Sequence, residues 1–409
     1  MHLDRSRTDA DRLQTAGLPE SFCPMPWIHA YADPRGDVRP CCWYDGVLDG
    51  SPNLSGMDGL DDVMGCDGMV GTRAAFLRGE TPDACQVCRR REDQGQYSKR
   101  MKGMDSVTDG ELASFARGPM DGTISSYELR HFDFRFDNTC NFRCRTCGPV
   151  NSSRIESEDR SLGMPPSTGG FDRDRWHSAF MEHLGSARTV YFAGGEPLIM
   201  ESTYDMLERL IGSGNTDAAI SCSTNLSQLS TRGRRILDLW SRFPDVTISI
   251  SLDHYGEKAS YIRNGTEWDQ IVSNYRLLRT SCPDARMQID CVVSVLNILD
   301  ITDIIERFRM TFDSMPINLL PVMGKPHFDP VNMPYEAKRV ATARMLEWCN
   351  ANPHDHGMVA VLRSIASGMD ATARHDSPAK FMAAMERLDA IRGESIRSSL
   401  PELSGFYGA

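Results

Sequence analysis

The chain has 409 residues, of which 40% are apolar and 25% charged, so it is long enough to bury a full core and to form more than one domain. Its formal net charge of −11 at pH 7 argues against non-specific nucleic-acid binding, because an acidic chain repels a phosphate backbone. No signal peptide and no apolar run of bilayer length is apparent, which predicts a cytoplasmic location and no membrane partner.

The first third of the chain is predicted to form a small metal-bound domain followed by a linker. Residues 1–20 are polar and are expected to be loose. Residues 21–100 are rich in Gly, Pro, Asp and Cys, and such a composition buries little apolar surface, so a bound metal is the expected source of stability. The basic run over 88–100 predicts a solvated helix face, and contact with an acidic substrate or shielding of the charge of an auxiliary cluster are the alternatives. The Gly-, Ser- and Asp-rich stretch over 101–128 predicts a linker.

The region 129–325 predicts an α/β core. Six segments have the length and apolar character of strands: 129–136, 187–195, 218–225, 246–253, 287–296 and 317–322. Helical patterns separate them at 201–212, 228–243, 267–281 and 300–311. This alternation predicts a parallel sheet with right-handed crossovers, either open and twisted or a partial barrel, with ligands at the carboxyl ends of its strands. Residues 326–409 predict a helical C-terminal extension.

Cysteine is the most informative residue type in this sequence. Thirteen cysteines in a chain without a secretion signal indicate metal ligands rather than disulfides. Cys140, Cys144 and Cys147 form a CxxxCxxC triplet just after the first predicted strand. Thiolates suit zinc or an iron–sulfur cluster, but a structural zinc site needs a fourth ligand and none follows nearby. The triplet therefore predicts a cluster in which one iron remains open to another ligand.

With this triplet, the chain resembles the radical S-adenosylmethionine (SAM) superfamily over residues 129–325. Three further segments resemble motifs of that family in the same order: AGGEPL (193–198), STN (223–225), and SISLD with YIRNG (249–253 and 261–265). The resemblance implies a partial (β/α)6 barrel, a variant of the TIM barrel, in which a 4Fe–4S cluster on the three cysteines carries the catalysis.

The same resemblance implies which residues contact SAM. Gly194, Gly195, Glu196 and Pro197 would receive its amino group, Ser223 and Asn225 its ribose, and Ser251 and Arg263 its carboxylate. Glycines suit a loop that a ligand approaches closely, and an arginine suits a carboxylate because it can donate two parallel hydrogen bonds. The residue after Asn225 is often glycine in the family and is Leu226 here.

The activity implied by the resemblance is reductive cleavage of SAM to a 5′-deoxyadenosyl radical, which removes a hydrogen atom from the substrate. Such an oxidoreductase needs a reducing partner such as flavodoxin or ferredoxin. The substrate is left open between a peptide and a small molecule. Cys222 and Cys291 fall inside predicted strands, where free cysteine usually acts as a small core residue, and hydrogen donation to a substrate radical is the alternative.

A second set of cysteines precedes the core. It consists of Cys23, Gly36 and Cys41, followed by the CxxC pair Cys85 and Cys88. This pattern resembles the start of a SPASM domain in its shorter, single-cluster "twitch" form, here placed before the barrel instead of after it. The resemblance implies that the four cysteines ligate an auxiliary 4Fe–4S cluster, with Cys42 as an alternative to Cys41. The same four thiolates would also suit zinc.

Two other functions compete with the enzyme hypothesis. One is a binding protein in which both cysteine sets hold zinc, and metal analysis would distinguish it. The other is an iron–sulfur electron carrier without SAM chemistry. The AGGEPL segment argues against a carrier, since a carrier has no use for an amino-group pocket.

Overall fold

The structure is a computed structural model and describes residues 8–93, 97–135, 137–369 and 377–407. Within those ranges, no helix combines the length and apolar character needed to cross a bilayer. The chain divides into two compact units. Unit 1 comprises residues 1–140, 149–223 and 230–247, and unit 2 comprises residues 141–148, 224–229 and 248–409.

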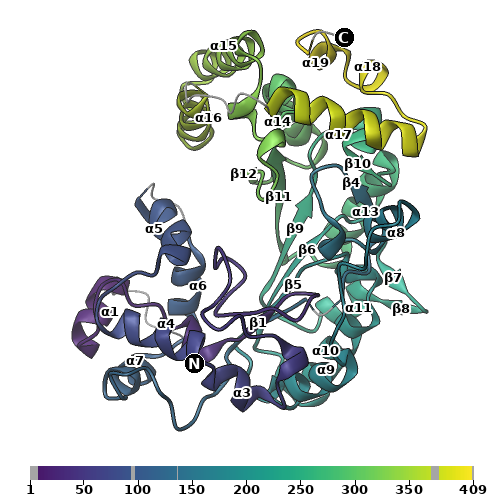
Figure 1. Cartoon of the computed structure of the whole chain (residues 1–409). Helices are drawn as coiled ribbons and strands as arrows, with labels where there is room; N and C mark the ends of the chain where they lie inside the picture. Colours follow the sequence, from purple (N-terminus) through teal and green to yellow (C-terminus); the bar gives the residue numbers. More distant parts are fainter. Residues whose placement is uncertain (1–7, 94–96, 136, 370–376, 408–409) are drawn as a thin grey trace. The chain divides into compact units, whose positions relative to one another are not determined.

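All six predicted strands are present. They are β3 (His131–Phe134), β5 (Thr189–Phe192), β6 (Ala219–Thr224), β9 (Val246–Ser251), β11 (Arg286–Val293) and β12 (Ile317–Pro321). The strand order is β12-β11-β9-β6-β5-β3-β1-β2, and the pairs β3–β5, β5–β6 and β11–β12 are parallel (Figure 1). The predicted α/β class with a parallel six-stranded sheet is therefore confirmed. Phe136, within the first predicted strand, lies outside the described residues.

Three of the four predicted core helices match the structure closely. They are α10 (Glu201–Gly212), α13 (Trp268–Ser281) and α14 (Ile301–Thr311). The helix predicted over 228–243 is wrong in its first half, where β7 (Ser230–Thr231) and β8 (Arg234–Arg235) form a hairpin before α11 (Ile236–Trp240). Arg232 and Gly233 have φ values of 44° and 81°, so the turn uses left-handed backbone that ends any helix.

The remaining helices of the core and of the C-terminal part complete the two units. In unit 1 they are α8 (Ser153–Ser161) and α9 (Arg173–Glu182). In unit 2 they are α12 (Gly256–Ile262), α15 (Tyr335–Ala351), α16 (His356–Gly368), α17 (Ser377–Arg392), α18 (Ile396–Ser399) and α19 (Pro401–Ser404). The C-terminal part, green to yellow in Figure 1, is helical as predicted.

The N-terminal segment is part of unit 1 and extends its sheet. β1 (Tyr31–Ala32) pairs in parallel with β3 and antiparallel with β2 (Val38–Arg39). The helices here are α1 (Asp9–Ala16), α2 (Met25–Ile28), α3 (Leu60–Gly65), α4 (Asp67–Leu77) and α5 (Gln86–Asp93). One apolar cluster joins several of these elements, and its members include Leu13, Phe22, Trp27, Phe76, Met104 and Leu112.

The stretch expected to be a linker holds two helices, α6 (Lys99–Asp105) and α7 (Asp109–Ala116). Met104, Val107 and Leu112 are fully buried in the same apolar cluster, which is the physical reason that the stretch folds. A capping box opens α7, in which Thr108 and Glu111 satisfy each other's backbone N–H groups.

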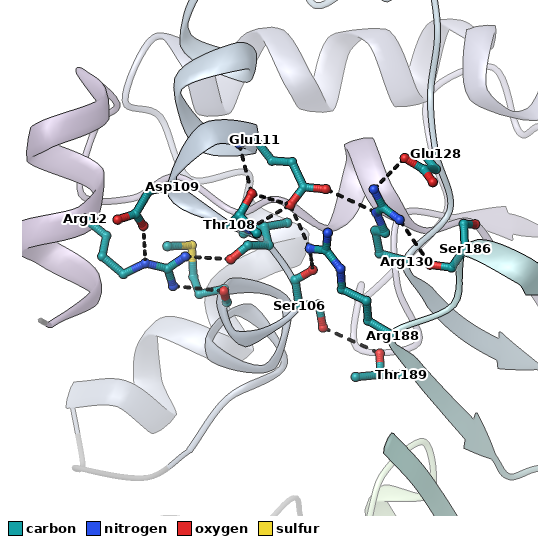
Figure 2. Close-up of polar contacts among 12 residues, drawn as sticks. Arg12, Ser106, Thr108, Asp109, Glu111, Glu128, Arg130, Ser186, Arg188 and Thr189 are labelled. Carbon is teal, nitrogen blue, oxygen red and sulfur yellow. Dashed lines mark hydrogen bonds and ion pairs between the residues drawn. The ribbon is translucent and has the colours of Figure 1, made fainter. Parts of the chain in front are cut away.

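Polar contacts also anchor these helices to the rest of unit 1. Glu111 accepts hydrogen bonds from Arg130 Nε at 3.1 Å and from an Arg188 guanidinium N–H at 2.7 Å. Arg12 Nε on α1 donates a hydrogen bond to Asp109 Oδ1 at 2.8 Å. Figure 2 shows this network running from α1 to the neighbourhood of β5. Residues 99–116 are therefore a folded part of unit 1.

Candidate functional site

The predicted cysteine triplet lies where the chain leaves unit 1. Cys140 is the last residue of the first stretch of unit 1, whereas Cys144 and Cys147 belong to unit 2. The predicted SAM residues divide in the same way. Gly194, Gly195, Glu196, Pro197 and Ser223 belong to unit 1, and Asn225, Ser251 and Arg263 belong to unit 2. Each unit is described by itself.

In unit 1, the glycine loop after β5 packs against the residue that precedes Cys140. The φ values of Gly194 and Gly195 are 81° and 50°, in the left-handed region that favours glycine. A Cβ atom on Gly195 would lie 2.3 Å from the carbonyl oxygen of Thr139. The backbone N–H of Glu196 donates to that same oxygen at 2.8 Å. The loop thus holds the backbone at the first cysteine, and only glycine fits this approach.

Helix α8 fixes Cys140 from its other side. The backbone N–H of Cys140 donates to Ser153 Oγ at 3.1 Å, and the Ser153 N–H donates to the Asn138 carbonyl at 2.8 Å. Asn138 in turn donates to Glu156 at 2.9 Å. The sequence analysis did not identify these residues. The only indication in the sequence is that Asn138, Ser153 and Glu156 are polar residues close to the cysteine motif.

The other predicted residues of unit 1 lie at the carboxyl ends of neighbouring strands. Glu196 is buried, and its carboxylate accepts a hydrogen bond from the Leu198 N–H at 3.1 Å. Pro197 begins the short 3-10 helix Pro197–Ile199. Ser223 on β6 shares a hydrogen bond of 2.8 Å with the Tyr191 hydroxyl on β5.

In unit 2, Arg263 pairs with the second cysteine. The strand β10 (Arg263–Asn264) runs antiparallel to β4 (Arg143–Cys144), with Arg263 opposite Cys144. One guanidinium N–H of Arg263 donates to the Asp253 carboxylate at 3.2 Å. Among the described residues, its Nε is buried and has no hydrogen-bond partner. A buried N–H without a partner is costly, so this donor is available to a ligand.

The charges around Arg263 favour its protonated form. Burial alone would lower its pKa, but the adjacent Cys144, Asp253 and Cys147 raise it above the ordinary value. Burial raises the pKa of the Cys147 thiol, and the charges of Lys325 and Arg263 counteract this. Lys325 donates to the Arg145 carbonyl at 3.1 Å and also contacts the Cys147 carbonyl. Lys325 therefore contacts the predicted cysteine segment, and no motif in the sequence indicated this.

Asn225 joins the end of β6 to the cysteine segment of unit 2. Its side-chain amide donates to Asn141 Oδ1 at 3.0 Å, and Asn141 immediately follows Cys140. Leu226 has a φ of 54°, so a leucine here takes the left-handed conformation that glycine adopts most easily. Ser251 is half-buried at the end of β9, two residues before Asp253.

Four of the N-terminal cysteines of unit 1, Cys23, Cys41, Cys85 and Cys88, lie near one another. Cys41 belongs to the apolar cluster described above, and Cys23 and Cys85 pack against it. Burial raises the pKa of Cys23, and the charges of Cys88 and Cys85 raise it further. Burial likewise raises the pKa of Cys85, with Cys41 and Cys88 adding to the shift. In the described part of the chain, no three His, Cys, Asp or Glu side chains are grouped closely enough to hold one metal ion as they stand.

Cys42 faces a different group. Burial raises the pKa of its thiol, and the other charges that act on it are those of Asp133, Lys99 and Arg135. Burial also raises the pKa of Cys41, and the charges that raise it further are that of its neighbour Cys42 and then those of Cys23 and Cys88. Of the two adjacent cysteines, Cys41 therefore lies with the other three thiols.

The two cysteines within strands face the apolar side of their strands. Cys222 is fully buried and lies on the same face of β6 as the buried Ile220. The half-buried Ser221 and Ser223 lie on the opposite face of the strand. Cys291 is buried on the same face of β11 as Ile289. Both positions favour the small core residue over the hydrogen donor.

Comparison of the sequence with models of known families and with curated proteins finds no match. Several solved structures are similar to this chain. One is anSMEcpe with bound AdoMet, which is 13% identical over 56% of this chain and 62% of that chain, with a TM-score of 0.40. Another is Streptococcus suis SuiB bound to the precursor peptide SuiA, which is 12% identical over 70% of this chain and 64% of that chain, with a TM-score of 0.38. A third is TYW1 with a lysine–pyruvate adduct bound, which is 15% identical over 48% of this chain and 63% of that chain, with a TM-score of 0.30. The chain spans less than two thirds of the length of each.

Proposed function

We propose that this chain is a radical SAM enzyme that cleaves SAM reductively and removes a hydrogen atom from a peptide or a small molecule, with help from an auxiliary cluster. One observation carries the proposal. Segments far apart in sequence, each resembling a SAM-binding motif, contact the cysteine segment within their own unit. The glycine loop binds Thr139, Asn225 binds Asn141, and Arg263 pairs with Cys144.

The residues present suit the cofactors of that chemistry. Cys140, Cys144 and Cys147 would hold a 4Fe–4S cluster, because thiolates are its usual ligands. Arg263 combines a buried Nε without a partner among the described residues with a second N–H anchored on Asp253. Such a guanidinium suits the carboxylate of SAM.

When bound, the cluster would supply the electron that splits the sulfonium of SAM and so generates the 5′-deoxyadenosyl radical. The role of the protein is then orientation. Asp253 holds Arg263 in place for the SAM carboxylate. The backbone of the glycine loop would receive the amino group, with Glu196 at the end of the loop. Ser223 and Asn225 would contact the ribose, and Tyr191 and Asn141 position their side chains.

The auxiliary set fits the same account. Cys23, Cys41, Cys85 and Cys88 would ligate a second 4Fe–4S cluster completely, which favours electron transfer with the substrate over direct substrate binding. The charges that these thiols exert on one another support this ligand set over one that contains Cys42.

Anaerobic reconstitution tests the function. Protein with two clusters should contain about eight irons per chain and should release 5′-deoxyadenosine from SAM after reduction by dithionite. About two zincs and no iron would instead identify the zinc-bound binding protein. Iron without 5′-deoxyadenosine would identify the electron carrier and refute the enzyme.

Replacing Cys85 by alanine should remove only the auxiliary cluster. We expect iron to fall from about eight to about four per chain, while reduced protein still forms 5′-deoxyadenosine, because the triplet is intact. Cys42→Ala is the matched control and should keep all the iron, since its thiol faces Asp133. Loss of iron in Cys42→Ala would place Cys42 in the ligand set instead of Cys41, and full iron in Cys85→Ala would remove Cys85 from it.

Replacing Arg263 by lysine should weaken SAM binding selectively. An ammonium group cannot reproduce the two-pronged guanidinium contact, so we expect the KM for SAM to rise about tenfold, or about 1.4 kcal/mol, with iron content unchanged. Arg339→Lys, at an exposed position of unit 2, is the control. An unaltered KM in Arg263→Lys would show that Arg263 does not bind the SAM carboxylate.

A further inference from the structure

Three neighbouring strands of unit 1 present a row of polar side chains. Asp133 on β3 is the register partner of Tyr191 on β5, and Tyr191 is the partner of Ser221 on β6. Side chains alternate between the two faces of a strand, so these three share one face. The opposite face is apolar and buried, as Val190 and Ile220 show. The polar row is therefore not part of the core that holds the strands together.

Two lysines of α6 lie against this row. Lys99 and Lys102 are three positions apart and so share one side of the helix. Lys102 Nζ donates to Ser221 Oγ at 3.1 Å, and Lys99 Nζ lies 3.8 Å from the Asp133 carboxylate. Both ammonium groups also lie over the Tyr191 ring, at 4.4 Å for Lys99 and 5.4 Å for Lys102. Lys99 is buried, contrary to the solvated helix face predicted over 88–100.

Arg135 adds a third cation. Its guanidinium donates to both oxygens of Asp133, at 2.8 and 3.2 Å, and its centre lies 5.5 Å from the Tyr191 ring. Burial opposes ionisation of Asp133, but Arg135 and Lys99 hold its pKa below the usual range. One ionised carboxylate thus contacts two cations, and among the described residues Lys102 has no carboxylate within ion-pair distance.

Two buried histidines next to this group add no charge. Burial lowers the pKa of His29 to about 4, and burial with the charge of Lys99 lowers that of His131. The Nε2 atoms of both rings are buried and have no hydrogen-bond partner in the described part of the chain. Neutral rings with an open polar atom, beside an excess of cations, indicate a polar ligand.

We propose that Lys99, Lys102 and Arg135, arranged around Tyr191, bind a carboxylate of the substrate. Cations withdrawn from water without full pairing are costly, and an anionic ligand would offset that cost. That the bound carboxylate belongs to the substrate rests on the function proposed above. That these residues bind an anion rests only on the contacts within unit 1. The alternative, that these cations only balance the charge of nearby thiolates, predicts no anion binding.

The reconstituted full-length protein tests the site with acetate as the probe. At pH 7, acetate should raise the unfolding temperature relative to chloride at equal ionic strength, because a ligand of the native state stabilises it. Lys102→Met should weaken acetate binding about tenfold, and Lys102→Arg should restore it because the cation is kept. Lys380→Met, an exposed lysine of α17, is the control and should bind acetate as the wild type does.

The outcomes separate the site from the function. Absence of an acetate effect in the wild type, or full acetate binding by Lys102→Met, would overturn the site. Binding of inorganic phosphate without acetate would overturn the assignment to a carboxylate. Formation of 5′-deoxyadenosine without substrate is measured in the same samples and should persist in Lys102→Met. If the wild type binds acetate but does not cleave SAM, the site stands and the proposed function fails.

The pH dependence provides a second readout. Burial and the charge of Lys99 lower the pKa of Lys102 to about 8. The protonated ammonium binds the anion, so affinity should be full below that pKa and fall by up to about tenfold at pH 9. Lys102→Met should lack this dependence. The charged, titratable or polar groups that face Lys102 are Lys99, Asp133, Cys42, Asp245, His131, Tyr191 and Ser221.

Discussion

Replacing Cys144 by alanine is expected to abolish the release of 5′-deoxyadenosine from SAM. The triplet has no spare thiolate, so loss of one ligand should cost the whole cluster and lower iron from about eight to about four per chain. The backbone pairing of Cys144 with Arg263 does not depend on the thiol, so the fold of unit 2 should persist. Iron analysis and product detection under anaerobic conditions measure both effects.

The control for this variant is Cys282→Ala, which removes a buried thiol of unit 2 outside every motif. It should retain about eight irons and wild-type product formation. Equal iron in Cys144→Ala and the wild type would show that the triplet does not hold a cluster. The enzyme hypothesis would then lose its basis.

Replacing Gly195 by alanine is expected to cause the largest loss of SAM binding outside the cysteines. The new Cβ would lie 2.3 Å from the Thr139 carbonyl oxygen and 2.5 Å from Met200 Cε, at a φ of 50°. Left-handed backbone costs a side chain about 1–2 kcal/mol, and the clash must also move the loop. We expect kcat/KM for SAM to fall about 100-fold, which corresponds to about 2.7 kcal/mol.

Gly185→Ala is the matched control for that substitution. Gly185 has no atom within 4 Å of its ideal Cβ position and no positive φ, so alanine should be tolerated. Iron content should stay near the wild-type value in Gly185→Ala. Iron is also measured in Gly195→Ala, because the clash with the Thr139 carbonyl lies next to Cys140. Normal kcat/KM in Gly195→Ala would mean that the loop does not contact SAM.

The parts of the fold that sequence reasoning recovered are those with a strong local signal. The segment 287–296 alternates apolar and polar residues, and it forms β11 with that alternation intact. The glycine loop was identified because glycines suit the close approach of a ligand. The structure shows a close approach of the Thr139 backbone to Gly195, and the contact with SAM stays a prediction. Patterns of this kind can be recognised from the sequence because residue type and spacing within one short segment carry them.

The parts that sequence reasoning missed depend on distant partners. Helix α6 is short and contains Gly103, so its composition indicated a linker, yet Met104 is buried through contacts with remote residues. Strand β1 has only two residues and exists because β3 pairs with it. Lys99 was expected on a solvated face for the same reason, since only the folded chain brings Asp133 to it.

The parallel pairing of β1 with β3 has a practical consequence. The cysteine-rich segment contributes a strand to the same sheet as the first strand of the core. It therefore cannot be removed or exchanged as an independent domain. Cutting it away would remove the parallel partner of β3 and leave that strand at the edge of the sheet, and an exposed edge strand favours aggregation. Engineered variants of this chain should therefore keep residues 21–135 together, because β1 in the cysteine-rich segment supports β3 in the core.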